Sequence, residues 1–140
     1  MIGKLNCVML IDDNADDNFF HQRVINKTGR VNEIVVMESG EEALSYLKEH
    51  EKHPESNPDL IFLDINMPGM NGWEFLEEYE TLSTEAKAKK VVVMLSTSFN
   101  PEDREKAMSI KSNERFLNKP LIVEDFCNLL ERFFPEVSEG

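Results

Sequence analysis

The sequence has few of the residues that mark disulfide-rich or zinc-binding proteins. Its two cysteines, Cys7 and Cys127, are far apart and form no CxxC pair. We therefore expect two buried free thiols in a reducing compartment. The three histidines, His21, His50 and His53, lack the spacing of metal ligands, so we assign them no role at a metal.

Long apolar runs and positive charge are also lacking. No apolar stretch reaches 18 residues and no signal-peptide core is present, so we predict a cytoplasmic protein without a membrane span. Lys and Arg number 15 against 27 Asp and Glu, which gives a net charge of −12. Nucleic acids and anionic membranes would repel such a chain, whereas a basic or cationic partner would be attracted.

The length and composition fit one ordinary globular domain. The chain has 140 residues, of which 41% are apolar, and it contains no internal repeat or low-complexity segment. We predict a single domain over residues 1–140, with a core from about 5 to 134 and no output domain after it.

Short apolar runs rich in Val, Ile and Leu predict the strands. They show little alternation, which is typical of parallel strands buried on both faces. Four runs are clear and a fifth is weaker: residues 5–11, 33–37, 60–63, 91–95 and, less clearly, 115–117.

Helical patterns lie between these runs. Asn14 can cap a helix that ends near residue 28, before Gly29. Ser39 and Glu42 have the spacing of a capping box. Three further helices are predicted from apolar stripes at 75–82 and 126–133 and from the cap and first-turn proline at 100–101. The βα alternation predicts an α/β fold, a doubly wound five-stranded parallel sheet with helices on both faces.

Reactive side chains follow the predicted strands. In an open parallel sheet the carboxyl ends of the strands share one edge, where ligands bind. We therefore expect these residues to meet in one cleft, although they are far apart in sequence: Asp12, Asp13, Asp64, Ser96, Thr97 and Lys119.

The charge of this cleft predicts a cation. Three carboxylates and one lysine leave about −2 if all are ionised, and like charges at ~4 Å repel by roughly 4 kcal/mol at a dielectric near 20. Oxygen ligands favour Mg²⁺, Mn²⁺ or Ca²⁺ over zinc, and a site with few protein ligands and a nearby phosphate favours Mg²⁺.

Four motifs resemble the receiver domains of two-component response regulators. They are LIDDN at 10–14, LDINMPGMNG at 63–72, LST at 95–97 and NKP at 118–120. The resemblance extends from Cys7 to about Phe134 and includes the spacing of the motifs. It implies a stand-alone receiver domain, similar to the chemotaxis regulators, with the flavodoxin-like strand order 2-1-3-4-5.

The resemblance also implies roles for the site residues. Asp64 matches the phosphoacceptor, and Lys119 matches the lysine that pairs with a phosphoryl oxygen. Asp13 matches the direct Mg²⁺ ligand, whereas Asp12 binds the metal largely through water. Asn66 matches the position whose backbone carbonyl completes the ligands.

A switch is implied in the same way. Ser96 matches the hydroxyl that turns toward the phosphoryl group, and Phe116 matches the aromatic residue that moves with it, although tyrosine is often found there. Thr97 stands where a small residue is usual, and the peptide before Pro120 is commonly cis. The predicted signalling surface comprises the helix after Pro101, the fifth strand and the last helix.

The resemblance implies a phosphoacceptor signalling protein, not an enzyme acting on other substrates. Its donor would be a histidine kinase or a histidine phosphotransfer protein, and its target another protein.

Two alternatives stay open. A phosphatase of the haloacid dehalogenase type needs a DxD pair, which Asp12-Asp13-Asn14 lacks, and a cap. A receiver-like module that works without phosphorylation usually lacks an acid, the acceptor or the lysine, and none is missing here.

Overall fold

The computed structural model describes residues 4–50, 57–82, 91–96, 105 and 116–135. Apart from residue 105, the helix expected after Pro101 lies outside these residues, as do Thr97 and His53. The elements are β1 Leu5–Ile11, α1 Ala15–Thr28, β2 Val31–Met37, α2 Gly40–Glu49, β3 Leu60–Asp64, α3 Gly72–Glu80, β4 Val91–Ser96, β5 Phe116–Asn118 and α5 Val123–Phe133.

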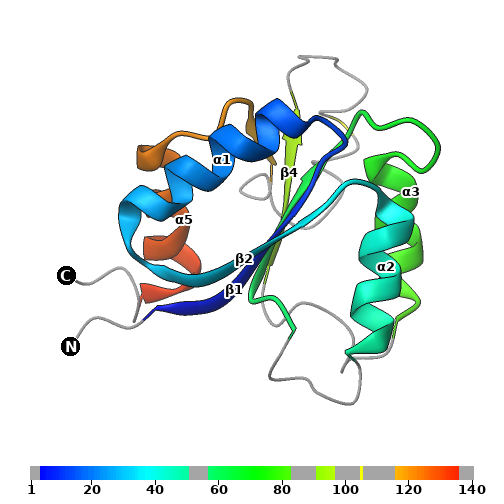
Figure 1. Ribbon diagram of the computed structural model, residues 1–140, viewed down its shortest axis with the longest axis horizontal. Helices are drawn as coiled ribbons and strands as arrows, with labels where there is room; N and C mark the ends of the chain where they lie inside the picture. The colour runs from blue at the N-terminus through cyan, green and yellow to red at the C-terminus, as the bar shows by residue number, and fades with distance from the viewer. Residues whose placement is uncertain (1–3, 51–56, 83–90, 97–104, 106–115, 136–140) are drawn as a thin grey trace.

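The strands form one parallel sheet in the order β2-β1-β3-β4-β5, so the predicted fold is confirmed. Helices α1 and α5 cover one face and α2 and α3 cover the other (Figure 1). This doubly wound arrangement follows from right-handed crossovers between parallel strands. Within the described residues, no helix is long and apolar enough to cross a membrane.

The core is divided by the sheet into two layers. Along β1, Val8 and Leu10 pack toward α1 and α5, whereas Met9 and Ile11 pack toward α2 and α3. The central strand β3 alternates in the same way, and all five of its residues are buried. The apolar runs without polar gaps are therefore central strands buried on both faces.

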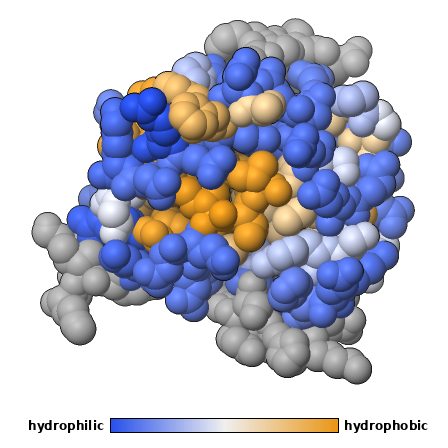
Figure 2. Space-filling model, viewed as in Figure 1, coloured by the Kyte–Doolittle hydropathy of each residue, from blue (hydrophilic) through white to orange (hydrophobic). Residues whose placement is uncertain are grey.

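Strand β2 departs from the expectation that every strand is buried on both faces. It is an edge strand, and its apolar residues, such as Val35 and Val36, are only half-buried. Figure 2 shows hydrophobic side chains gathered over the middle of the face that β2 crosses in Figure 1. Strand β2 starts at Val31, two residues before the predicted start, and so includes the exposed Asn32, which the predicted run 33–37 left out.

Local sequence signals place the helix ends. Asn14 accepts a hydrogen bond from the Asp17 amide, and Gly29 ends α1 with φ 65°, a left-handed conformation that glycine adopts readily. Ser39 accepts the predicted bond from the Glu42 amide at the start of α2. A complete capping box, in which Asn71 and Glu74 exchange two hydrogen bonds between side chain and backbone, occurs at the start of α3. The sequence analysis did not predict it.

The prediction of two buried thiols is half wrong. Cys7 is buried in β1, but Cys127 is exposed on α5, and neither forms a disulfide within the described residues. Cys127 follows the buried Phe126 and precedes the buried Leu129, so it lies beside the apolar stripe of the helix and not in it.

Helix α3 begins directly against the end of β3. The Gly72 amide donates a hydrogen bond of 2.9 Å to the Ile65 carbonyl. A Cβ atom on Gly72 would lie 2.8 Å from both the Asp64 carbonyl oxygen and the Ile65 Cα atom. Only a residue without a side chain permits this contact, so Gly72 helps to fix the backbone of Asp64.

We predict that Gly72→Ala destabilises the protein by about 1–3 kcal/mol, because the added methyl group must displace backbone atoms. Gly40→Ala is the matched control, since Gly40 is also a buried first residue of a helix. Its added Cβ would meet chiefly the flexible side chain of Met70, with Sδ at 2.8 Å. Urea unfolding should show a smaller loss for Gly40→Ala, and equal losses would contradict this account.

Candidate functional site

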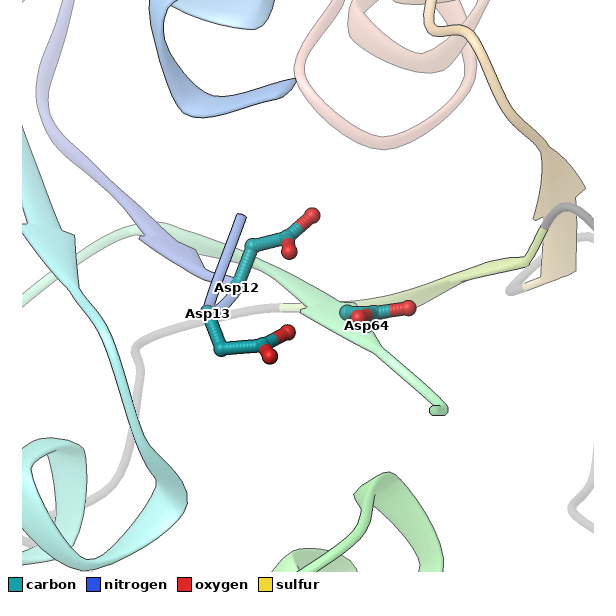
Figure 3. A group of neighbouring side chains, drawn as sticks. All are labelled: Asp12, Asp13 and Asp64. Atoms are coloured by element: carbon teal, nitrogen blue, oxygen red, sulfur yellow. The ribbon is translucent and has the colours of Figure 1, made fainter. Parts of the chain in front are cut away.

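The three predicted carboxylates come together at the carboxyl edge of the sheet. Asp12 and Asp13 follow β1 and Asp64 ends β3 (Figure 3). One oxygen from each lies within 4.8 Å of the others. Asp12 and Asp64 are buried and Asp13 is exposed, so the acidic group opens to solvent on the side of Asp13.

Backbone hydrogen bonds hold Asp12 in place. Its amide donates to the Met37 carbonyl at 3.0 Å, which ties it to the end of β2. Its carboxylate accepts a bond of 2.9 Å from the Asn14 amide, and its carbonyl accepts a bond of 2.8 Å from the Asn18 side chain. Asp12 is therefore fixed at both the backbone and the side chain.

Asp64 is buried beside the negative charge of Asp12, and Lys119 only partly offsets the effect of these surroundings. Burial, followed by the negative charge of Asp12, raises the pKa of Asp64 to about 6. Lys119 and the Asn66 amide, which donates to Asp64 Oδ1 at 3.3 Å, oppose that rise. Near neutral pH the group is thus an ionised carboxylate with more proton affinity than an ordinary aspartate.

Lys119 reaches this edge from the loop after β5. Its ammonium nitrogen lies 2.6 Å from Asp12 Oδ2, 2.9 Å from Asp17 Oδ2 and 3.4 Å from Asp64 Oδ1. Burial alone would lower the pKa of Lys119, but the hydrogen bonds to Asp12 and Asp17 raise it above its usual value. Lys119 is therefore a cation, and the cis peptide before Pro120 that the resemblance implied is present.

The acidic group suits a hard divalent cation. Asp12, Asp13 and Asp64 offer carboxylate oxygens, the ligands that Mg²⁺ prefers. Asp12 and Asp64 are buried, so a cation beside them would offset the repulsion that Lys119 alone does not cancel. The contribution of the Asn66 carbonyl stays a prediction, since no contact of that atom tests it.

The predicted switch residues are placed by their backbones only. Ser96 ends β4 opposite Asn118, and Phe116 begins β5 opposite Met94. Leu95, which precedes Ser96, lies opposite Asp64. Ser96 therefore follows the residue that lies opposite Asp64, on the strand between β3 and β5.

Two side chains of α1 belong to the site although the sequence analysis gave them no role there. Asp17 binds Lys119, and the buried ring of His21 accepts a hydrogen bond of 3.2 Å at Nε2 from the Leu121 amide. Burial and then the charge of Lys119 lower the pKa of His21, which favours the neutral ring. Their i, i+4 spacing places both on one face of α1, which was the available sequence signal.

Comparisons with known proteins agree with this fold. The sequence profile of the response regulator receiver domain matches residues 8–131. A probable methanogenesis regulatory protein, FilR2 of Methanothrix harundinacea, is 33% identical over 94% of this chain and 81% of its own length. A two-component response regulator from Cytophaga hutchinsonii superposes with a TM-score of 0.81 at 36% identity, covering 92% of this chain and 96% of its own. A receiver protein from Dyadobacter fermentans gives 0.76 at 28%, covering 90% and 95%.

We predict that Asp64→Asn stabilises the metal-free protein by roughly 1–3 kcal/mol above pH 6. The pKa of Asp64 is about 6 in the folded protein against an ordinary 3.8. The folded state therefore binds this proton more tightly, and wild-type stability falls as the pH rises from 3.8 to 6. The advantage of Asp64→Asn should accordingly shrink as the pH falls from 6 to 4.

Urea unfolding in a chelating buffer measures this difference. His21 titrates in both proteins, so comparing them isolates Asp64. Asp16→Asn, at an exposed acid of α1, should change the free energy of unfolding by less than about 0.5 kcal/mol. An Asp64→Asn protein less stable than wild type at pH 7 would show that burial does not dominate.

Proposed function

This chain belongs to the response regulator receiver domain family, and on that premise we propose that it accepts a phosphoryl group on Asp64. One observation carries the proposal: the buried Asp64 carboxylate lies beside an acidic pair and beside a buried lysine cation. This combination provides a nucleophile, ligands for a metal and a cationic partner for phosphoryl oxygens.

The carboxylate of Asp64 would act as the nucleophile. One of its oxygens forms a bond to phosphorus while the bond from phosphorus to the donor's leaving atom breaks, which yields an acyl phosphate. With a pKa of about 6, Asp64 is mostly ionised at neutral pH, so its oxygen needs no separate base. The protein's main task is to position the reactants and to stabilise the charge on the transferring group.

Mg²⁺ bound by Asp12, Asp13, Asp64 and the Asn66 carbonyl would supply positive charge to the phosphoryl oxygens. The chain itself supplies the rest. Asp12 is held by its backbone bonds, so it orients the site without moving. Lys119, already near Asp64 Oδ1, can pair with a phosphoryl oxygen.

We infer that the donor is a phosphohistidine on a histidine kinase or a histidine phosphotransfer protein. We also infer that the phosphorylated form acts on another protein, which is signalling and not turnover of a substrate. This inference rests on the family, because the described residues identify neither partner.

Acetyl phosphate with Mg²⁺ tests acceptance directly. Wild type should gain the mass of one phosphoryl group, and Asp64→Asn should gain none because it lacks the nucleophile. Asp13→Ala or a chelator should abolish most labelling, since the metal loses a direct ligand. Intact-mass spectrometry reads each result, and a phosphorylated histidine phosphotransfer protein serves as a second donor.

The outcomes separate the alternatives. Equal labelling of Asp64→Asn and wild type would refute the assignment of the acceptor. Release of phosphate from many phosphate esters with turnover would indicate a phosphatase. No adduct from either donor would indicate a receiver-like module that works without phosphorylation.

We further propose that the phosphoryl group draws the Ser96 hydroxyl inward and frees space for the Phe116 ring. The backbone register supports this path, because β4 and β5 are neighbouring strands and Phe116 lies opposite Met94, two residues before Ser96. Such a change is a shift between two packings, so the phosphoryl group must interact better with one of them. The signalling surface would then comprise the helix after Pro101, β5 and α5.

Beryllofluoride with Mg²⁺ can mimic the phosphoryl group in an NMR test of this switch. Amide shifts should change from Ser96 through about Phe116 and much less in α2. Ser96→Ala should reduce the distal changes while beryllofluoride still binds, because the hydroxyl that links the two sites is gone. Distal changes concentrated in α2 would contradict the mechanism even if Asp64 is the acceptor.

A further inference from the structure

The ammonium group of Lys119 already donates two hydrogen bonds to carboxylates in this structure. It has three N–H donors, and three carboxylates surround it: Asp12 at 2.6 Å, Asp17 at 2.9 Å and Asp64 at 3.4 Å. Only 7% of the lysine side chain is exposed. A phosphoryl oxygen would therefore compete for Lys119 with Asp12 and Asp17, whose carboxylates already accept its hydrogen bonds.

The three carboxylates differ in how readily they can give up their contact with Lys119. The Asp12 side chain is 5% exposed and also accepts a bond from the Asn14 amide, so losing Lys119 would leave a buried charge poorly paired. Asp64 would carry the phosphoryl group itself. The Asp17 side chain is 37% exposed, so water can replace Lys119 there at much smaller cost.

The position of Asp17 is set by the start of α1. The Asp17 amide donates to the capping side chain of Asn14, which fixes the backbone of this turn. The next residue, Asn18, is buried and donates from its side chain to the Asp12 carbonyl. The turn that carries Asp17 is therefore attached to β1, and the Asp17 carboxylate is held beside Lys119 by structure and not by charge alone.

We propose that Asp17 is a positioning residue that competes with the phosphoryl group for Lys119 and so sets the affinity of the site for that group. The proposal rests on the function proposed above. In the resting protein Asp17 holds Lys119 closer to itself than to Asp64. On phosphorylation Lys119 exchanges Asp17 for a phosphoryl oxygen, and Asp17 turns to solvent.

Substitution of Asp17 tests this competition. At saturating Mg²⁺, Asp17→Asn should bind beryllofluoride roughly three- to tenfold more tightly than wild type, because the competing charge is gone while the shape is kept. Asp17→Ser, which also removes the carboxylate, should act in the same direction, whereas Asp17→Glu should return the affinity toward that of wild type. Fluorescence of Trp73, half-buried on α3, can follow the titration.

Asp16→Asn is the matched control. Asp16 carries the same charge on the same turn and is exposed, and no hydrogen bond links it to Lys119 in the part of the chain that the structure describes. Its substitution therefore reports the general effect of removing one negative charge near the site. A gain for Asp17→Asn that clearly exceeds the gain for Asp16→Asn supports the proposal.

Two failures can be distinguished. If wild type with Mg²⁺ does not bind beryllofluoride, the proposed function fails and this inference fails with it. If wild type binds, but Asp17→Asn binds no more tightly than Asp16→Asn, the competition is refuted and the phosphoacceptor function stands. Thermal unfolding of each variant checks that it is folded at the temperature of the titration.

Discussion

A buried ammonium group among carboxylates is the interaction on which the functional edge of this molecule depends. Asp12 and Asp64 end up buried near each other because parallel strands β1 and β3 end side by side. Two such charges would repel strongly, and Lys119 offsets part of that repulsion from the loop after β5. Removing Lys119 would leave these buried carboxylates without their cation, a change that typically costs about 3–5 kcal/mol, so about that much stability depends on the position of this loop.

The rest of the fold holds these charged groups rigidly in place. Two apolar layers fix the sheet, and the ends of its central strands carry the acids. The raised pKa of Asp64 shows that the site remains less favourable for a carboxylate than water is. A reactive anion kept in unfavourable surroundings is typical of functional sites, where part of the stability of the fold is given up for chemistry.

The parts of the fold that were predicted correctly depend on signals from residues close together in the sequence. β1 and α1 have the predicted bounds, because a continuous apolar run, an asparagine cap and a terminal glycine are signals within a few residues. β2 was predicted too short, because an edge strand carries polar residues such as Asn32. Asp12, Asp13, Asp64 and Lys119 were predicted to meet because the topology brings strand ends together.

The residues that were missed depend on contacts across the fold. Asp17 meets Lys119 from 102 residues away, and His21 meets Leu121 from 100 residues away. An acid in the first turn of a helix already has an explanation in the helix dipole, and this explanation applies equally to Asp16 and Asp17. The tertiary structure distinguishes the two acids, because it places Asp17 within 2.9 Å of the Lys119 ammonium group.

Helix α1 also limits how the site can respond to a ligand. Asn18 links α1 to the Asp12 carbonyl, and His21 links it to the Leu121 amide, two residues after Lys119. Both hydrogen bonds are buried, and leaving a buried polar group unpaired costs about 1–3 kcal/mol. On this side, therefore, we expect the Lys119 side chain to rearrange while the backbone that carries it stays in place. We therefore expect a larger conformational response to pass through the other side of Asp64, along β4 and β5, which carry Ser96 and Phe116.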